Sequence, residues 1–162
     1  MITFRFSRFA FLLVAAILLT VSVASAAGPY QFFSVTPCRI ADTRGNGFTG
    51  ASGPPSLAGG APRNFPVAGL CGLPGGANAP AAVALNVTAV GPTLEGFLKI
   101  WPFNTTVPAV STINFAAGEP AIANGAIVPL SSDATFQISI VYGTGAPGGN
   151  VNVILDVTGY FK

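Results

Sequence analysis

The chain has 162 residues, and only 7% of them are charged, where an average soluble domain has about 25%. Two of its seven basic residues, Arg5 and Arg8, precede residue 27, and the remaining basic and acidic residues balance at five each. A balanced chain without a cationic run lacks the electrostatic footprint for binding nucleic acid or anionic lipid, so neither is an expected partner.

The first 26 residues predict a signal peptide helix. Arg5 and Arg8 form a positive start, residues 9–23 form an apolar run, and Ala24-Ser25-Ala26 forms a cleavage signal. Cleavage after Ala26 and cleavage after Ala27 both fit this pattern. The apolar run is shorter than the about 20 residues that a membrane span needs, so no span is expected in the mature chain. Residues 27–162 are then long enough for a single domain.

After residue 27 the chain consists of short apolar runs separated by turn residues, which include all 20 glycines and all 14 prolines. This pattern predicts an all-β fold, an antiparallel β-sandwich of jelly-roll or Greek-key type with about eight or nine short strands. The strands are expected at residues 30–35, 38–43, 63–67 (as an edge strand), 82–90, 96–101, 111–116, 123–130, 135–142 and 151–161.

Residues 82–90 show the strand period most plainly. Val83, Leu85 and Val87 point to one side of an extended chain, and the residues between them point to the other. Residues 153–159 repeat the same pattern, so the two segments are expected to form the spine of the sandwich. Residues 82–101 also predict a hairpin, with its turn at Pro92 to Glu95.

Residues 44–62 form a long loop, rich in glycine, proline and serine, with Phe48 and Leu57 as its apolar anchors. A loop of this length is functional, mobile or held at its ends. Two cysteines in an exported chain predict one disulfide, Cys38 to Cys71, which would hold both ends of this loop. The alternative is a reactive or metal-binding thiol.

Charged residues in and beside the strands predict a structural ion network. Asp42, Arg44 and Asp156 lie in or beside apolar strands, and Arg39 and Arg63 lie near turns. An ionised group in such surroundings generally needs a partner. We expect Asp42 or Asp156 to accept hydrogen bonds from one or more of the arginines, which would tie the long loop to the sandwich. The alternative is that an arginine binds a ligand.

Cofactor, metal and catalytic sites are not expected. Residues 45–50 match G-x-G-x-x-G, but Pro54-Pro55 follow and prevent the helix that a dinucleotide fingerprint requires. The chain has no histidine, no C-x-x-C and no D-x-D-x-D cluster, so no metal site is predicted. The absence of histidine also removes the commonest general base, and the protein is not expected to be an enzyme. Trp101 is a candidate for stacking against a sugar, although aromatic residues in strands belong more often to the core.

Five segments carry a resemblance to an uncharacterised family of exported bacterial β-domains. They are residues 36–44 (TPCRIADTR), 71–74 (CGLP), 84–88 (ALNVT), 113–118 (INFAAG) and 154–161 (ILDVTGYF). The resemblance implies a secreted or cell-surface module, found alone or attached to larger exported proteins. It supports the Cys38–Cys71 pairing, because both cysteines lie inside matching motifs, and it implies no catalytic or binding residues.

We therefore expect an exported structural or adhesive domain, located outside the cell, at its surface or in the periplasm. It would act through self-association or by attachment to an extracellular surface. The first alternative is a carbohydrate-binding module, and the second is a small hydrolase, in which two of the carboxylates Glu95, Glu119 and Asp133 would meet in space. The ligand, the oligomeric state and the strand order do not follow from the sequence.

Overall fold

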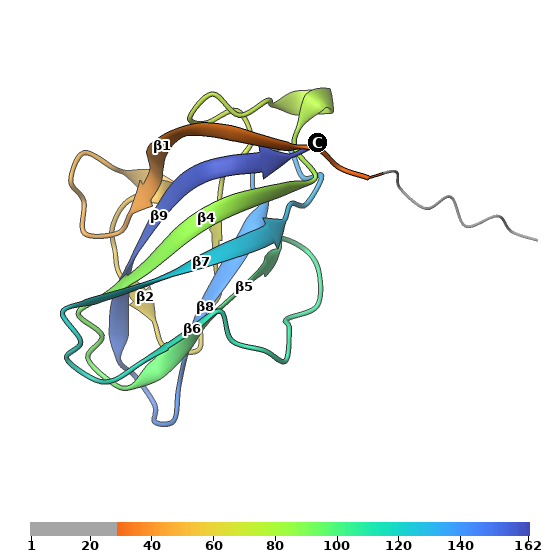
Figure 1. The fold of residues 1–162 in the computed structure, drawn as a ribbon. Coiled ribbons are helices and arrows are strands. Elements are labelled where there is room, and N and C mark those ends of the chain that lie inside the picture. Colours follow the sequence, from red (N-terminus) through yellow and green to blue (C-terminus); the bar gives the residue numbers. More distant parts are fainter. Residues whose placement is uncertain (1–28) are drawn as a thin grey trace, which may run out of the picture.

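Nine strands form two antiparallel sheets that pack face to face in the computed structural model, which describes residues 29–162 (Figure 1). The all-β sandwich expected from the sequence is confirmed. The strands are β1 (Phe32–Asp42), β2 (Leu57–Ala58), β3 (Arg63–Phe65), β4 (Ala82–Val90), β5 (Gly96–Pro102), β6 (Ile113–Phe115), β7 (Ala121–Pro129), β8 (Ile138–Thr144) and β9 (Asn150–Phe161). The only helical elements in this part of the chain are two 3₁₀ turns, Gly50–Ser52 and Gly76–Asn78. The predicted signal peptide lies outside the described residues.

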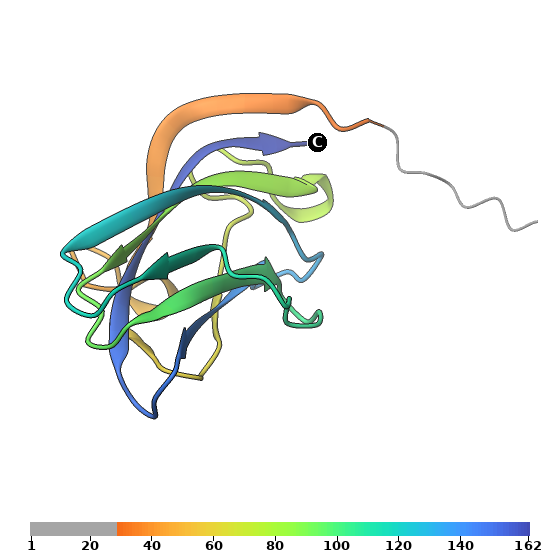
Figure 2. The same ribbon diagram turned by 60° about the horizontal axis from the view of Figure 1, so that its bottom comes forward.

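The larger sheet has the strand order β1-β9-β4-β7, with β2 also paired to β9. The smaller sheet has the order β3-β8-β5-β6, and Figure 2 shows the larger sheet curving over it. Most consecutive strands lie in different sheets, so the chain crosses repeatedly from one layer to the other. Within residues 29–162, no helix is long and apolar enough to cross a membrane.

The two segments expected to form the spine lie side by side, because β4 pairs with β9 along its whole length. Val83, Leu85, Val87 and Ala89 point into the sandwich and are fully or almost fully buried. Burying a valine or leucine side chain contributes about 1.5–3 kcal/mol. The alternation in β4 therefore fixes which face of the larger sheet covers the core.

The predicted hairpin between residues 82 and 101 is wrong, since β4 belongs to the larger sheet and β5 to the smaller one. The turn between them carries the chain across the sandwich. It is held there by Tyr142 of the smaller sheet, whose hydroxyl donates a hydrogen bond to the Leu94 carbonyl at 2.7 Å. The prediction was wrong because each of the two strands has one buried face, and this alternation is the same whether the strands pair with each other or with other strands.

β1 is one strand, where the sequence predicted two strands separated by Thr36-Pro37. Its pairing with β9 shifts register between Ser34 and Cys38 and again between Arg39 and Ala41. Pro37 is tolerated because β1 is an edge strand and bulged there, so that no ladder hydrogen bond has to come from its nitrogen.

The long loop leaves the edge of the larger sheet after β1 and returns to it at β2. Leu57 of β2 pairs with Val151 of β9 and is buried, which confirms it as an apolar anchor of the loop. Gly59 then forms a parallel bridge to Tyr142 of β8 in the smaller sheet. Residues 57–60 therefore close one side of the sandwich.

Candidate functional site

The ion network expected from the sequence forms on the outer side of the larger sheet, at the start of the long loop. The Arg39 guanidinium donates to Asp156 through Nε (2.8 Å) and Nη2 (3.2 Å), and to Asp42 through Nη1 (3.3 Å). Arg44 donates to the Asp42 carboxylate through Nε (2.9 Å) and Nη2 (2.7 Å). The network therefore links β1 to β9 and to the first residues of the loop.

Asp42 is the centre of this network, with a side chain that is 0% exposed. Hydrogen bonds from the Arg44 guanidinium hold the pKa of its carboxyl well below the usual range, and burial opposes this shift. The Asn46 amide (3.0 Å) and the Arg44 backbone N–H (3.1 Å) also donate to it. The carboxylate thus orders the first residues of the loop, as a side chain does in an Asx turn.

Arg63 does not join the network, which corrects the expectation that it pairs with Asp42 or Asp156. It donates instead to backbone carbonyls on the far part of the loop, those of Gly50, Ala51, Gly53 and Pro55. Burial lowers the pKa of its guanidinium. Arg63 still ties the loop to the sandwich, through acceptors that the sequence could not reveal because every residue carries the same carbonyl.

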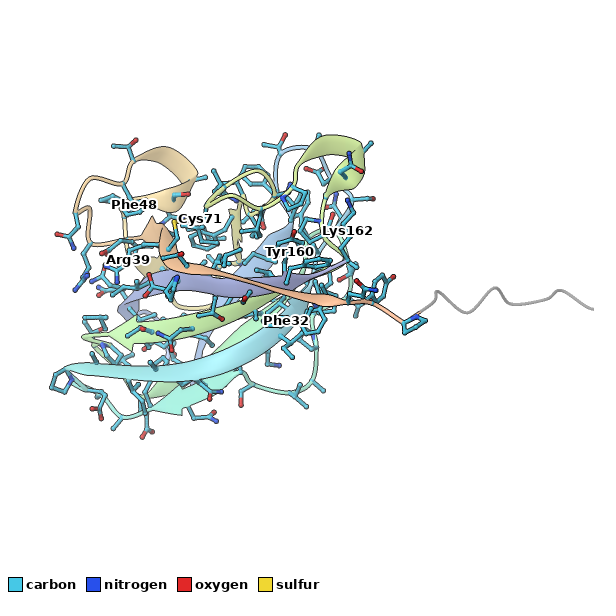
Figure 3. All side chains as sticks on the ribbon, turned by 45° about the horizontal axis from the view of Figure 1, so that its top comes forward. Phe32, Arg39, Phe48, Cys71, Tyr160 and Lys162 are labelled. Carbon is cyan, nitrogen blue, oxygen red and sulfur yellow. A yellow bond between two sulfur atoms is a disulfide. The ribbon has the colours of Figure 1, made fainter. Side chains whose placement is uncertain are left out.

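The predicted disulfide between Cys38 and Cys71 is confirmed, with a Cα–Cα distance of 5.8 Å. It joins β1 to the connection between β3 and β4. Figure 3 shows Phe48 and Cys71 close to Arg39, at the end of β1 that leads into the loop. The disulfide and the ion network therefore stabilise the same corner of the molecule.

Two shallow grooves flank Arg39. One of about 440 Å³ is lined by Pro37, Cys38, Arg39, Asn86, Asp156 and Thr158, and one of about 340 Å³ by Arg39, Phe48, Cys71 and neighbouring loop residues. An anion entering either groove would have to compete with Asp42 and Asp156 for the Arg39 donors. This geometry favours the structural interpretation of the arginines over ligand binding.

A further groove, of about 560 Å³, lies at another end of the sandwich between residues 68–81 and 130–137. The one buried polar side chain that lines it is Gln137. Its Oε1 accepts hydrogen bonds from the N–H groups of Val67 (2.6 Å) and Ala68 (3.0 Å), and its Nε2 donates to the Asp133 carbonyl (2.8 Å). Gln137 orders the adjoining loops, and the sequence did not point to it because an amide in an apolar run carries no motif.

The hypothesis that Trp101 stacks against a sugar is not supported, because this residue is only 6% exposed. The exposed aromatic residues gather instead near the start of β1, where Tyr30, Phe32 and Phe33 are 55%, 52% and 40% exposed. Phe33 stacks on Tyr160 with ring centroids 5.1 Å apart. Figure 3 shows Phe32 and Tyr160 at the end of β1 opposite to Arg39.

The outer face of the larger sheet is built mostly of small, uncharged residues. From the register of β4 with β7 and β9, its outward positions include Ala84, Thr88, Ala123, Gly125 and Ile127. Ile127 is 66% exposed. The charges on this face, Arg39 and Asp156, neutralise each other.

No three side chains of histidine, cysteine, aspartate or glutamate come together within residues 29–162 in a way that could hold a metal ion. Fold and site together define an all-β sandwich with one disulfide and an internal arginine–aspartate network. No family model, curated protein or solved structure matches the chain. The resemblance to exported bacterial β-domains therefore stays a prediction.

Proposed function

We propose that the protein is an exported structural or adhesive β-domain without catalytic activity, which acts by self-association or by attachment to an extracellular surface. The observation that carries this proposal is the outer face of the larger sheet, where Ala84, Ala123, Gly125 and Ile127 present a surface without net charge. Such a surface repels a second protein surface only weakly and permits close contact.

The chemistry of the charged residues supports a structural role. Asp42, the aspartate whose pKa is strongly shifted, is neutralised by two arginines and carries the start of the long loop. A general acid or base would need a pKa near the working pH. The pKa of Asp42 is instead lowered from its ordinary value, which moves it further from neutral pH. Export is supported by the signal-peptide pattern of residues 1–26 and by the disulfide, a bond typical of oxidising compartments.

A carbohydrate-binding role is the second candidate, and the exposed aromatic residues near the start of β1 favour it. Tyr30 lies before the first strand and is the most exposed of them, and an exposed aromatic side chain is the kind of group against which a sugar stacks. Tyr30→Ala is the variant that tests this role, because Tyr30 lies outside the sheet and its loss leaves the pairing of β1 with β9 intact.

The test uses the exported protein in the form in which cells release it, with its N-terminus identified by mass spectrometry. We expect the average mass in sedimentation and light scattering to rise with concentration, or the protein to bind to the surface of the producing cells, with no signal on a glycan array. Glycan binding that disappears in Tyr30→Ala would favour the second candidate. Turnover of a hydrolase substrate panel would overturn the proposal.

A further inference from the structure

Strand β7 forms one edge of the larger sheet, and its outer side has no partner in the described part of the chain. It pairs with β4 over all nine residues, Ala121 to Pro129, without a register shift. No backbone hydrogen bond joins these residues to any described segment other than β4. Alternate N–H and C=O groups of an edge strand point away from the sheet, so β7 presents a row of free donors and acceptors.

β7 lacks most of the features that protect edge strands from pairing. It carries no charged residue and no bulge, and its one proline, Pro129, is its last residue. Figure 1 shows it as the long strand beside β4 at the border of the larger sheet. An edge that is long, regular and uncharged can accept another strand.

Resting on the self-association in the proposed function, we propose that β7 pairs with β7 of a second copy of this chain. The two strands run antiparallel about a twofold axis at Gly125, which joins the two larger sheets into one continuous sheet. Gly125 is the middle residue of β7, Ala121–Pro129, so an axis there pairs all nine residues of one strand with all nine of the other. The axis places Ile122 opposite Val128 of the second copy, and Ala123 opposite its Ile127.

The side-chain rows of β7 fit this register on both faces. Ile122 packs against the core and Val128 is buried, so this pair of the inner row joins apolar to apolar. The other inner pair places Asn124, whose amide donates to the Thr112 carbonyl at 2.7 Å, opposite Ala126 of the second copy. The nearest charged residues lie at different distances from Gly125, since Glu119 precedes it by six positions and Asp133 follows it by eight. No two like charges therefore face each other, and Glu119 lies opposite Ser131 of the second copy.

Gly125 provides a direct way to test the axis. A Cβ atom built on this residue meets nothing within 4 Å, and the backbone there is not in the left-handed region. A side chain at this position is therefore compatible with the fold of one copy. Since residue 125 of one copy lies opposite residue 125 of the other, any side chain placed there meets its own copy across the axis.

The first experiment reads the register by oxidative cross-linking of the full chain. Directly opposite residues of an antiparallel pair have Cα atoms about 4.5–5.5 Å apart, which suits a disulfide. We expect Gly125→Cys to give a covalent dimer. The matched control is Ala123→Cys, on the same strand and the same face, whose two cysteines would lie about 14 Å apart at the strand rise per residue and would not join. Cross-linking of Ala123→Cys in place of Gly125→Cys would overturn the axis.

The second experiment uses charge. Like charges directly opposite each other destabilise a strand pair, so we expect Gly125→Lys and Gly125→Glu each to weaken dimerisation about tenfold. An equal mixture of the two variants is expected to regain dimers that weaken with added salt. Asn114→Lys, an exposed residue on edge strand β6 of the smaller sheet, is the control and leaves dimerisation unchanged.

The outcomes separate this inference from the proposed function. If the protein assembles but Gly125→Lys assembles equally well, the β7 pairing is wrong and self-association through another surface stands. A strictly monomeric wild-type protein overturns the β7 pairing, and the proposed function then depends on binding to the cell surface alone. Hydrolase turnover or glycan binding overturns the proposed function even if the β7 dimer forms.

Discussion

The two edges of the larger sheet are built in opposite ways. β1 carries two register shifts, a proline in its interior, an ion pair to β9 and a disulfide, and the long loop continues from its end. β7 is regular over nine residues and carries no charge. Irregular, charged and covalently linked edges resist pairing with another chain, whereas regular and uncharged ones accept it. The difference indicates that the residues of β1 prevent this edge from pairing with another strand, whereas β7 is able to pair.

The largest expected effect comes from breaking the disulfide at the β1 edge. Cys38 and Cys71 are 33 residues apart, and in the chain-entropy model closing such a loop stabilises the fold by about 3–4 kcal/mol. We expect the Cys38→Ser, Cys71→Ser double variant to lose about this free energy of unfolding, measured by urea denaturation. An unchanged midpoint would show that other contacts hold this corner.

Asp42→Asn is expected to cost about 2–3 kcal/mol, because it leaves Arg39 and Arg44 without the buried carboxylate that both contact. This loss is smaller than the loss expected on breaking a fully buried ion pair, because the guanidinium groups of Arg39 and Arg44 both reach solvent. Thermal unfolding at neutral pH measures it. Glu95→Gln, an exposed carboxylate outside the network, is the control and should have little effect.

The lowered pKa of Asp42 predicts that the loss of stability in Asp42→Asn depends on pH. The pKa of Asp42 is lower in the folded protein than its value of about 3.9 in an unfolded chain. Its stabilising contribution is therefore complete above about pH 4 and decreases as the pH falls toward the folded-state pKa. The difference in melting temperature between wild type and Asp42→Asn should shrink as the pH is lowered below about 4. A constant difference would contradict the assignment of this ionisation to Asp42.

Alanine substitutions at two glycines, Gly159 and Gly125, allow the two edges of the larger sheet to be compared directly. A Cβ on Gly159, in the strand next to β1, would lie 2.3 Å from the Phe32 ring and 2.8 Å from the Phe33 carbonyl, whereas Gly125 in β7 has open space. We expect Gly159→Ala to cost about 1–3 kcal/mol through this crowding. Gly125→Ala should be neutral or slightly stabilising, since alanine loses less backbone entropy than glycine in a strand. Urea denaturation at low protein concentration, where dimers dissociate, measures both.

Asp156→Asn is expected to have the smallest effect, about 0.5–1 kcal/mol. The ion pair of Asp156 with Arg39 is bidentate but partly exposed, with side chains 23% and 39% accessible. The loss should decrease at high salt, because screening acts on exposed pairs. If the melting temperature did not change at all, Asp156 would not contribute to the network.

The sequence alone was sufficient for the strands whose side chains alternate, for the disulfide and for most of the ion network. The strand expected at residues 82–90 has the bounds of β4, and residues 150–161 form β9, because a period of two reports on the two faces of a strand. Arg39, Asp42, Arg44 and Asp156 could be grouped because buried charges need opposite partners. The hydrogen-bond partners of Arg63 and Gln137 could not be predicted, because they are mainly backbone groups, which every residue carries alike.

Only the tertiary structure decided which strands pair and which edges stay open. β4 and β5 carry the expected patterns, yet they lie in different sheets, and the uncharged run at residues 121–129 becomes an edge only because nothing described pairs with its outer side. Backbone hydrogen bonds are the same for every residue, so side-chain alternation specifies a strand and its buried face but not its neighbour. The neighbour is set by the packing of both sheets around a common core.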